Sequence, residues 1–286
     1  MRRYLFALLL TGLIAPAAPA QDRRAQSLLV LRGAVERSGN FLVRMHAAEA
    51  LISNGYTNDI APCFPLRRGQ PSIQTTGSAR VLARLGQKKA MVPRIMEQFL
   101  MGDTLRNRLT ALESLAKLGF SKPLLPITAQ ADTGRGGFKA MALWVLSNNG
   151  AAEGEERLAA LLPSRIPTES FYAAYALRFK KKIGPATYRL LDSCATAGGA
   201  ADPGRVLVLS SFYVHAVPQH VGRARAALLH CLNGAAGDRY QVGEGLAIRG
   251  TPDDLPVLDR LLADEDEDVR VSAANAILHI TTRNKK

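Results

Sequence analysis

The residues of this 286-residue chain best suited to bind a metal or form a disulfide are three cysteines and five histidines. Cys194 and Cys231 occupy similar positions in two neighbouring predicted helices, so a disulfide between them is one hypothesis. Equivalent positions on stacked helices lie roughly 8–10 Å apart, which is farther than an unstrained disulfide reaches. We therefore favour free thiols packed beside core leucines.

Two further patterns resemble metal sites only in part. His215 and His220 are five residues apart with a proline between them, whereas two zinc ligands on one helix face are four apart. Three aspartates alternate in residues 264–268 as in a calcium-binding loop, but the glycine and the closing glutamate of such a loop are missing. Negative charge at the start of the next helix explains them without a metal. We predict no metal and no cofactor.

The glycine-rich segment 133–137 (TGRGG) precedes a predicted helix, so its N–H groups could hold an anion. It follows a helix and lacks the lysine pattern of a phosphate-binding loop, so we interpret it as a turn between repeats. The chain contains no zinc-protease or serine-hydrolase motif. We therefore predict no catalytic residues and no enzymatic activity.

Tyrosines and basic residues concentrate between residues 171 and 225, and tyrosine and arginine are the types that dominate binding hot spots. The chain has 37 Lys and Arg against 24 Asp and Glu, a net charge of +13 that suits an acidic partner or a polyanion. A solvated basic surface, with the tyrosines in the core, is the alternative. The predicted binding residues are Lys180, Lys181, Lys182, Arg189, Arg223, Arg225, Tyr172 and Tyr175.

The elements that position these side chains follow from a leucine that recurs every 31 to 33 residues. It stands at Leu51, Leu82, Leu115, Leu146 and Leu177, and the spacing resumes from residue 246 to residue 277. Apolar residues around each leucine recur at helical spacing. A period of this length indicates stacked helical units, each of which buries its apolar face only against its neighbours.

Each unit reads as a first helix, a glycine turn and a second helix begun by proline. The glycines are expected to adopt the left-handed conformation, and prolines fit the first turn of a helix. Small residues near the middle of the first helix let neighbouring helices approach closely. The glycines are Gly55, Gly86, Gly119, Gly150 and Gly250, the prolines are Pro62, Pro93, Pro126 and Pro256, and the small residues are Ala47, Ser78, Ala111 and Ala142.

Residues 43–51 (VRMHAAEAL) and 268–277 (DVRVSAANAI) resemble the first helix of HEAT repeats, of the short-period type named after phycobilisome lyases. The resemblance covers residues 40–286 and implies an all-α, right-handed α-solenoid of about seven to eight helix pairs. It also implies that a ladder of basic residues ties successive turns together. That ladder consists of Arg44, Arg108, Lys139, Arg239 and Arg270.

The first residues have the order of a secretory signal. Arg2 and Arg3 precede an apolar run and then small residues up to Ala20, so we expect residues 1–20 to be removed after Ala20. The run is too short to span a bilayer comfortably, and no later segment is apolar enough. We expect residues 21–39 to form an N-terminal cap helix, residues 40–286 to form the repeat domain, and the bacterial protein to be periplasmic or secreted.

These patterns predict a monomeric, non-catalytic scaffold that binds a protein partner along an extended surface. The second helices and the irregular segment 62–76 are the expected contact regions. One alternative is a protein that binds acidic polysaccharide or nucleic acid. Another is an enzyme, because HEAT-like stacks resemble phycobilin lyases and one class of alkylpurine DNA glycosylase, but export separates the chain from their internal substrates.

Overall fold

The computed structural model describes residues 20–150, 152–197 and 204–283, and every regular element in these ranges is a helix, so the protein is all-α as predicted. One set, the inner helices, consists of α2 (Phe41–Ser53), α3 (Ser72–Leu82), α5 (Leu105–Lys117), α7 (Gly136–Ser147), α9 (Pro167–Arg178), α11 (Arg205–His215), α13 (Ala236–Arg249) and α15 (Glu267–Arg283). The outer helices are α1 (Ala20–Arg37), α4 (Lys88–Met101), α6 (Leu125–Thr133), α8 (Ala152–Ala159), α10 (Pro185–Ala197), α12 (Val221–His230) and α14 (Leu255–Leu262). Single turns lie at η1 (Ala61–Cys63), η2 (Ala83–Gln87), η3 (Pro218–His220), η4 (Cys231–Asn233) and η5 (Pro252–Asp254).

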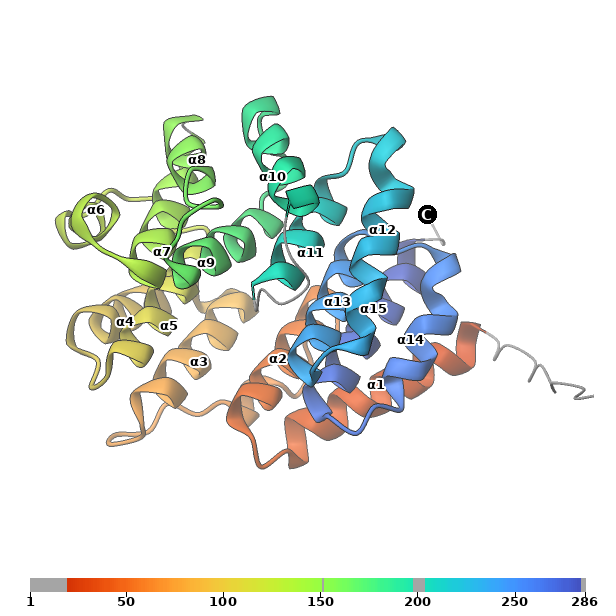
Figure 1. Cartoon of the computed structure of the whole chain (residues 1–286). Coiled ribbons are helices and arrows are strands. Elements are labelled where there is room, and N and C mark those ends of the chain that lie inside the picture. Colours follow the sequence, from red (N-terminus) through yellow and green to blue (C-terminus); the bar gives the residue numbers. More distant parts are fainter. Residues whose placement is uncertain (1–19, 151, 198–203, 284–286) are drawn as a thin grey trace, which may run out of the picture.

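The inner helices form a closed ring. Each packs against the next inner helix along the chain, from α2 to α15, and α15 packs in turn against α2. Helix α1 lies against both α2 and α15, so the two ends of the described chain meet (Figure 1). We expected an extended, open surface. The difference arises because α1 buries Leu31 and Val35 in this junction, which covers apolar faces that an open stack would leave exposed.

Polar contacts also cross the junction between the two ends. The Arg23 guanidinium of α1 donates two hydrogen bonds of 2.9 Å to the carboxylate of Asp259 in α14. The Asn54 amide donates to Asn275 of α15 over 3.0 Å, more than 220 residues away in sequence. Two further pairs join the first turn of α15 to the other end of the chain: Glu267 with Ser38, which lies between α1 and α2, and Asp268 with His46 of α2.

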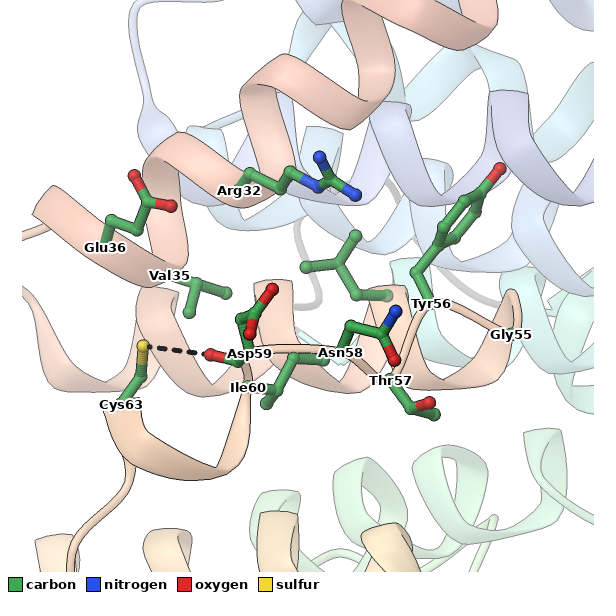
Figure 2. A pocket seen from close by; sticks show the side chains of 11 residues that line it. Arg32, Val35, Glu36, Gly55, Tyr56, Thr57, Asn58, Asp59, Ile60 and Cys63 are labelled. Carbon is green, nitrogen blue, oxygen red and sulfur yellow. Dashed lines mark hydrogen bonds between the residues drawn. The ribbon is translucent and has the colours of Figure 1, made fainter.

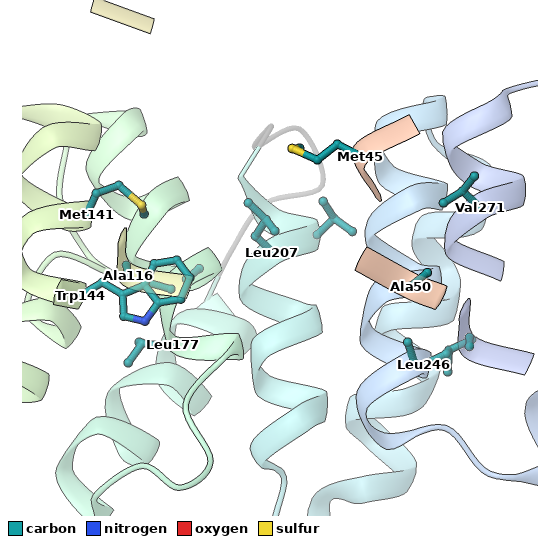
Figure 3. Packing of buried hydrophobic residues seen from close by; sticks show 14 of the residues in the cluster. Met45, Ala50, Ala116, Met141, Trp144, Leu177, Leu207, Leu246 and Val271 are labelled. Carbon is teal, nitrogen blue, oxygen red and sulfur yellow. The ribbon is translucent and has the colours of Figure 1, made fainter. Parts of the chain in front are cut away.

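The 31–33-residue period corresponds to the inner helices. The repeated leucines are buried there, except Leu146, which is half-buried. Ala47, Ala111 and Ala142 are fully buried where neighbouring inner helices cross, as predicted. The apolar side chains join into one cluster that includes α2, α7, α9, α11, α13 and α15 (Figure 3).

Most of the predicted turn residues behave as expected. Gly55, Gly86, Gly119 and Gly150 have φ between 68° and 101°. Gly250 does not: its φ is −53°, and glycine is needed there because a Cβ would lie 2.4 Å from the Leu246 carbonyl oxygen.

Only two of the four predicted prolines begin the second helix of their unit. Pro126 and Pro256 lie in the first turns of α6 and α14. Pro93 instead lies inside α4, because this helix begins at Lys88, directly after the Gly86 turn. Pro62 lies in η1, and the irregular segment predicted after it runs as far as Pro71.

Four of the predicted ladder residues bind the end of the preceding helical segment. Arg44 donates to the Val35 carbonyl over 3.0 Å, and Arg108 donates to the Phe99 carbonyl over 2.9 Å. In the last repeats, Arg239 donates to the Gly234 carbonyl over 3.0 Å and also pairs with the Asp264 carboxylate after the following helix, while Arg270 donates to the Asp264 carbonyl. These cations satisfy helix C-terminal carbonyls, which is a structural role. Lys139 is half-buried on α7.

The predicted signal segment falls almost entirely in residues 1–19, which lie outside the described residues. The expected cap helix corresponds to α1, which packs as the outer helix of the ring junction. Among the described helices, none has both the length and the apolar character needed to cross a membrane. The three cysteines are free thiols, so Cys194 and Cys231 are not bridged.

Candidate functional site

A cavity of about 850 Å³ lies in the middle of the ring. Its lining comes from the inner helices and the turns that follow them, and the outer helices contribute no lining residue among the described residues. The lining includes His46 and Glu49 from α2, Arg84 from η2, Lys117 from α5, Trp144 from α7, Phe179 to Lys182 after α9, Glu244 and Ile248 from α13, and Asn275, His279 and Arg283 from α15. Its volume suits a small molecule or a short peptide segment.

Two register positions of the repeat supply most of this lining. The residue two positions after each repeated leucine lines the cavity in all seven clear repeats: Ser53, Arg84, Lys117, Asn148, Phe179, Ile248 and His279. The residue two positions before the leucine lines it in four of them: Glu49, Trp144, Glu244 and Asn275. Positions four apart lie on one face of a helix, so this face points to the ring centre. The recurring leucines are buried and therefore did not indicate that the residues on either side of them line a cavity.

Arg80 and Glu113 occupy the position two residues before the leucine in two other repeats. They form a charged cluster beside the cavity. Arg80 is 1% exposed and donates to Glu49 over 3.0 Å, and its guanidinium also lies 3.5 Å from Glu113. Lys117 pairs with Glu113 at 3.0 Å, and Arg84 pairs with Glu49 at 3.2 Å. The buried Glu49 carboxylate and the partly buried Glu113 carboxylate are thus held by three cations from α3, η2 and α5.

The cations set the charge state of these carboxylates. Burial alone would raise the pKa of Glu49, but Arg80, Lys117 and Arg84 outweigh it and hold this pKa far below its usual range. Burial acts on Glu113 in the same way, yet Lys117 and Arg80 lower its pKa to about 2. Both groups are therefore ionised at neutral pH.

A second buried arginine has no carboxylate partner among the residues that the structure describes. Arg178 is 1% exposed, and its hydrogen bonds go to Gln241 over 2.6 Å and to Ser210 over 3.3 Å. Its guanidinium lies 5.3 Å from the ring centre of Tyr175 and 5.1 Å from that of Phe179. Aromatic faces stabilise a desolvated cation but do not neutralise it. The region around the cavity therefore carries excess positive charge.

One wall of the cavity is aromatic and basic. The Phe179 ring stacks on Trp144 with 5.4 Å between centroids, and the Lys117 ammonium lies 5.1 Å from the Phe179 centroid. Phe179 is nevertheless 36% exposed, as is Ile248 on α13. Two apolar residues of the cavity lining are therefore partly exposed to water.

The predicted lysines follow Phe179 directly. Lys180 donates to the Ser147 carbonyl over 2.8 Å, and burial lowers its pKa. Lys181 and Lys182 are exposed, line the cavity and have no ion-pair partner in the described part of the chain. Arg283 donates to the Ala247 carbonyl. Glu244 is the one lining acid with no hydrogen bond or ion pair among the described residues.

The other predicted binding residues lie away from the cavity lining. Arg223 and Arg225 on α12 pair with Asp192 and Asp254 at 2.6 Å, and Arg189 is exposed on α10. The six basic residues therefore do not form one strip.

The two predicted tyrosines have different surroundings. Tyr175 donates to Glu113 over 2.8 Å, and burial, followed by Glu113, raises its pKa, whereas Tyr172 packs on Phe171.

The partial motifs noted in the sequence have intramolecular partners. Gly136 of the glycine-rich segment donates its N–H to Glu169 over 3.2 Å, so a carboxylate of the protein already lies at the start of α7. Asp266 accepts from the Val269 N–H at the start of α15. Within the described ranges, no group of three His, Cys, Asp or Glu is placed to hold a metal ion.

A smaller cavity of about 180 Å³ lies between α1 and the turn after α2 (Figure 2). Arg32, Tyr56 and Asp59 contribute polar groups around Val35 and Ile60. It is smaller than the usual range for a ligand site, so the central cavity is the better candidate.

The chain matches no protein-family model, and a search of curated proteins found no relative.

Proposed function

We propose that this protein is a non-catalytic, HEAT-like binding protein that binds an acidic segment of a partner protein. The proposal includes a right-handed winding of about seven to eight helix pairs and a monomeric state. The 31–33-residue period and the arginines that cap preceding helices support the HEAT-like part.

The observation that carries the binding proposal is the charge of the central cavity. Its lining has six basic side chains, Arg84, Lys117, Lys180, Lys181, Lys182 and Arg283, against the two acids Glu49 and Glu244. Glu49 is already paired with Arg80 and Arg84. A concave site of one sign attracts ligands of the opposite sign. Lys181 and Lys182 are the cations most available to a partner.

Glu49 and His279 of the cavity lining, and Glu113 beside it, are poorly suited to acid–base catalysis at neutral pH. A general acid or base works best with a pKa near the working pH. The pKa of Glu113 is about 2 and that of Glu49 is lower than usual, while burial, with Arg283 and Arg84, lowers the pKa of His279 to about 4. We therefore propose a binding role for this site.

Selection from a phage-displayed library of random peptides tests the proposal. The purified protein should enrich peptides that carry Asp or Glu over peptides without an acidic residue. Replacing both exposed lysines (K181Q/K182Q) should weaken their binding at least about tenfold, which corresponds to 1.4 kcal/mol. The matched control is K88Q/K89Q, because Lys88 and Lys89 are exposed on α4 and do not line the cavity.

Enrichment of peptides without negative charge, or an equal loss in both double variants, would count against the proposal. The competing function is binding of a polyanion. If a single-stranded oligonucleotide binds with a steep logarithmic dependence on salt while no acidic peptide is enriched, that function replaces ours.

We also propose that the protein is exported after cleavage behind Ala20. The charged, apolar and small-residue order of residues 1–20 supports this. Sequencing the N-terminus of protein purified from the exported fraction tests it: Gln21 should be first, and a start at Met1 would refute cleavage.

A further inference from the structure

We infer that the acidic segment enters the central cavity with one carboxylate and a neighbouring aromatic side chain, and that the cavity discriminates against doubly charged groups. This inference rests on the proposed function and names the chemistry of the segment. It follows from three features of the cavity: its aromatic wall, the exposed Lys181 and Lys182, and Glu244, the lining acid that is unpaired within the described part of the chain.

The aromatic wall provides a surface for a ring. Phe179 is stacked on Trp144, lines the cavity and is 36% exposed, and Ile248, which lines it from α13, has the same exposure. Exposed apolar surface inside a concave site is stabilised when a ligand covers it. A purely charged ligand would leave this surface in water.

The cations beside that wall provide the counter-charge. Lys180, Lys181 and Lys182 follow Phe179 in sequence, and Lys181 and Lys182 have no acidic partner among the described residues. The buried Arg178, whose guanidinium lies 5.1 Å from the Phe179 ring centre, adds a positive charge that pairs with no carboxylate in the described ranges. A carboxylate within one or two residues of the bound aromatic ring would therefore meet positive potential.

Glu244 limits the amount of negative charge that fits. It lines the cavity from α13 and has no ion pair in the described part of the chain. The pKa of the neighbouring Tyr240 is raised by burial and by Glu244, which reflects the same negative field. A phosphate group or a run of acids brings more negative charge into the cavity that Glu244 lines, whereas a single carboxylate brings the least.

The test uses four acetylated and amidated glycine–serine hexapeptides with different central pairs: Asp-Phe, Asp-Ser, Asn-Phe and phosphoserine-Phe. Binding is measured by calorimetry and by fluorescence of Trp144, the single tryptophan of the chain, which lines the cavity. The Asp-Phe peptide should bind at least about tenfold more tightly than the Asp-Ser and Asn-Phe peptides, because each of those lacks one anchor. Its binding should change the Trp144 emission.

The variant E244Q tests the charge limit. It should raise the affinity of the phosphoserine-Phe peptide relative to the Asp-Phe peptide by about tenfold or more. K181Q/K182Q should weaken the Asp-Phe peptide, and K88Q/K89Q should not. If all acidic peptides bind equally, with no change in Trp144 emission, the segment binds outside the cavity, and this inference fails while the proposed function survives. If neither these peptides nor any library-selected acidic peptide binds, the proposed function fails as well.

Discussion

Arg80 and Glu49 occupy the same register position in successive repeats, two residues before the repeated leucine, and the Arg80 guanidinium donates to the Glu49 carboxylate over 3.0 Å. Arg80 also lies 3.5 Å from Glu113, which has this position in the next repeat. One arginine thus joins three consecutive inner helices. Because Arg80 and Glu49 are buried and Glu113 is partly buried, the pairing has consequences for stability that an exposed ion pair would not have.

Replacing Arg80 by methionine should destabilise the protein strongly. The substitution keeps an unbranched side chain of similar length but leaves Glu49 and Glu113 buried with less compensation, which typically costs about 3–5 kcal/mol. Urea unfolding measures the change in free energy. R106M is the control because Arg106 is exposed on α5, and it should change stability by less than about 0.5 kcal/mol. Adding E49Q and E113Q to R80M should recover part of the loss. Equal effects of R80M and R106M would contradict the buried-pair account.

Acid should destabilise the protein partly through His279. The pKa of this histidine is lowered to about 4, so it is neutral in the folded state, whereas an unfolded histidine has a pKa of about 6.5. Between these values the unfolded state binds more protons, so stability falls as the pH falls from about 6.5 to 4. H279Q should flatten that part of the stability–pH curve. H230Q is the control, since His230 is exposed and lies outside the cavity lining. An unchanged slope in H279Q would refute this assignment.

Replacing each of two glycines of α13 by alanine should have opposite effects on the stability of the protein. A Cβ at Gly243 would lie 2.2 Å from the Ser272 Oγ and 2.9 Å from its Cβ, at the contact between α13 and α15. G243A should therefore force the helices apart and cost about 1–3 kcal/mol. At Gly237 a Cβ would meet nothing within 4 Å, so G237A should be neutral or stabilise the helix by up to about 1 kcal/mol. Thermal unfolding compares them, and a G243A variant as stable as G237A would contradict the packing.

Breaking the Arg23–Asp259 pair should loosen the junction of the ring. Asp259 accepts hydrogen bonds from the nearly buried Arg23, so D259N should cost roughly 1.5–3 kcal/mol. It should also speed hydrogen exchange in α1 more than in α6. D132N removes the acid from the exposed Arg157–Asp132 pair and should cost less than about 1 kcal/mol. If exchange in α1 does not change, the pair does not hold the junction.

The sequence predicted the inner helices well because a packing requirement recurs in each of them. Leu115 and Leu177 are buried at the same register, and Gly55 and Gly119 have the positive φ that was expected. The closed ring could not be predicted from a repeated pattern, because contacts such as Asn54–Asn275 occur only once and join residues more than 220 positions apart.

The candidate site was predicted only in part. Lys180, Lys181 and Lys182 line the cavity, but Arg223 and Arg225 pair with acids on other elements. Charge and residue type alone do not tell which face of a helix a side chain occupies. The residues two before and two after each leucine, such as Glu49 and Lys117, could have been found by extending the repeat alignment one helical turn.

The most direct test of the closed ring is the distance between spin labels at residues 37 and 265, measured by pulsed electron paramagnetic resonance after the three cysteines are replaced by serine. Both side chains are exposed, and each label lies within two residues of the Ser38–Glu267 hydrogen bond. Backbone spacing of about 3.8 Å per residue then keeps the labels within roughly 25 Å. An open stack with about 8–10 Å between successive inner helices would place them roughly 60 Å apart. A single short distance is the result that we predict, and a distribution centred near the longer value would contradict the ring and the cavity inside it.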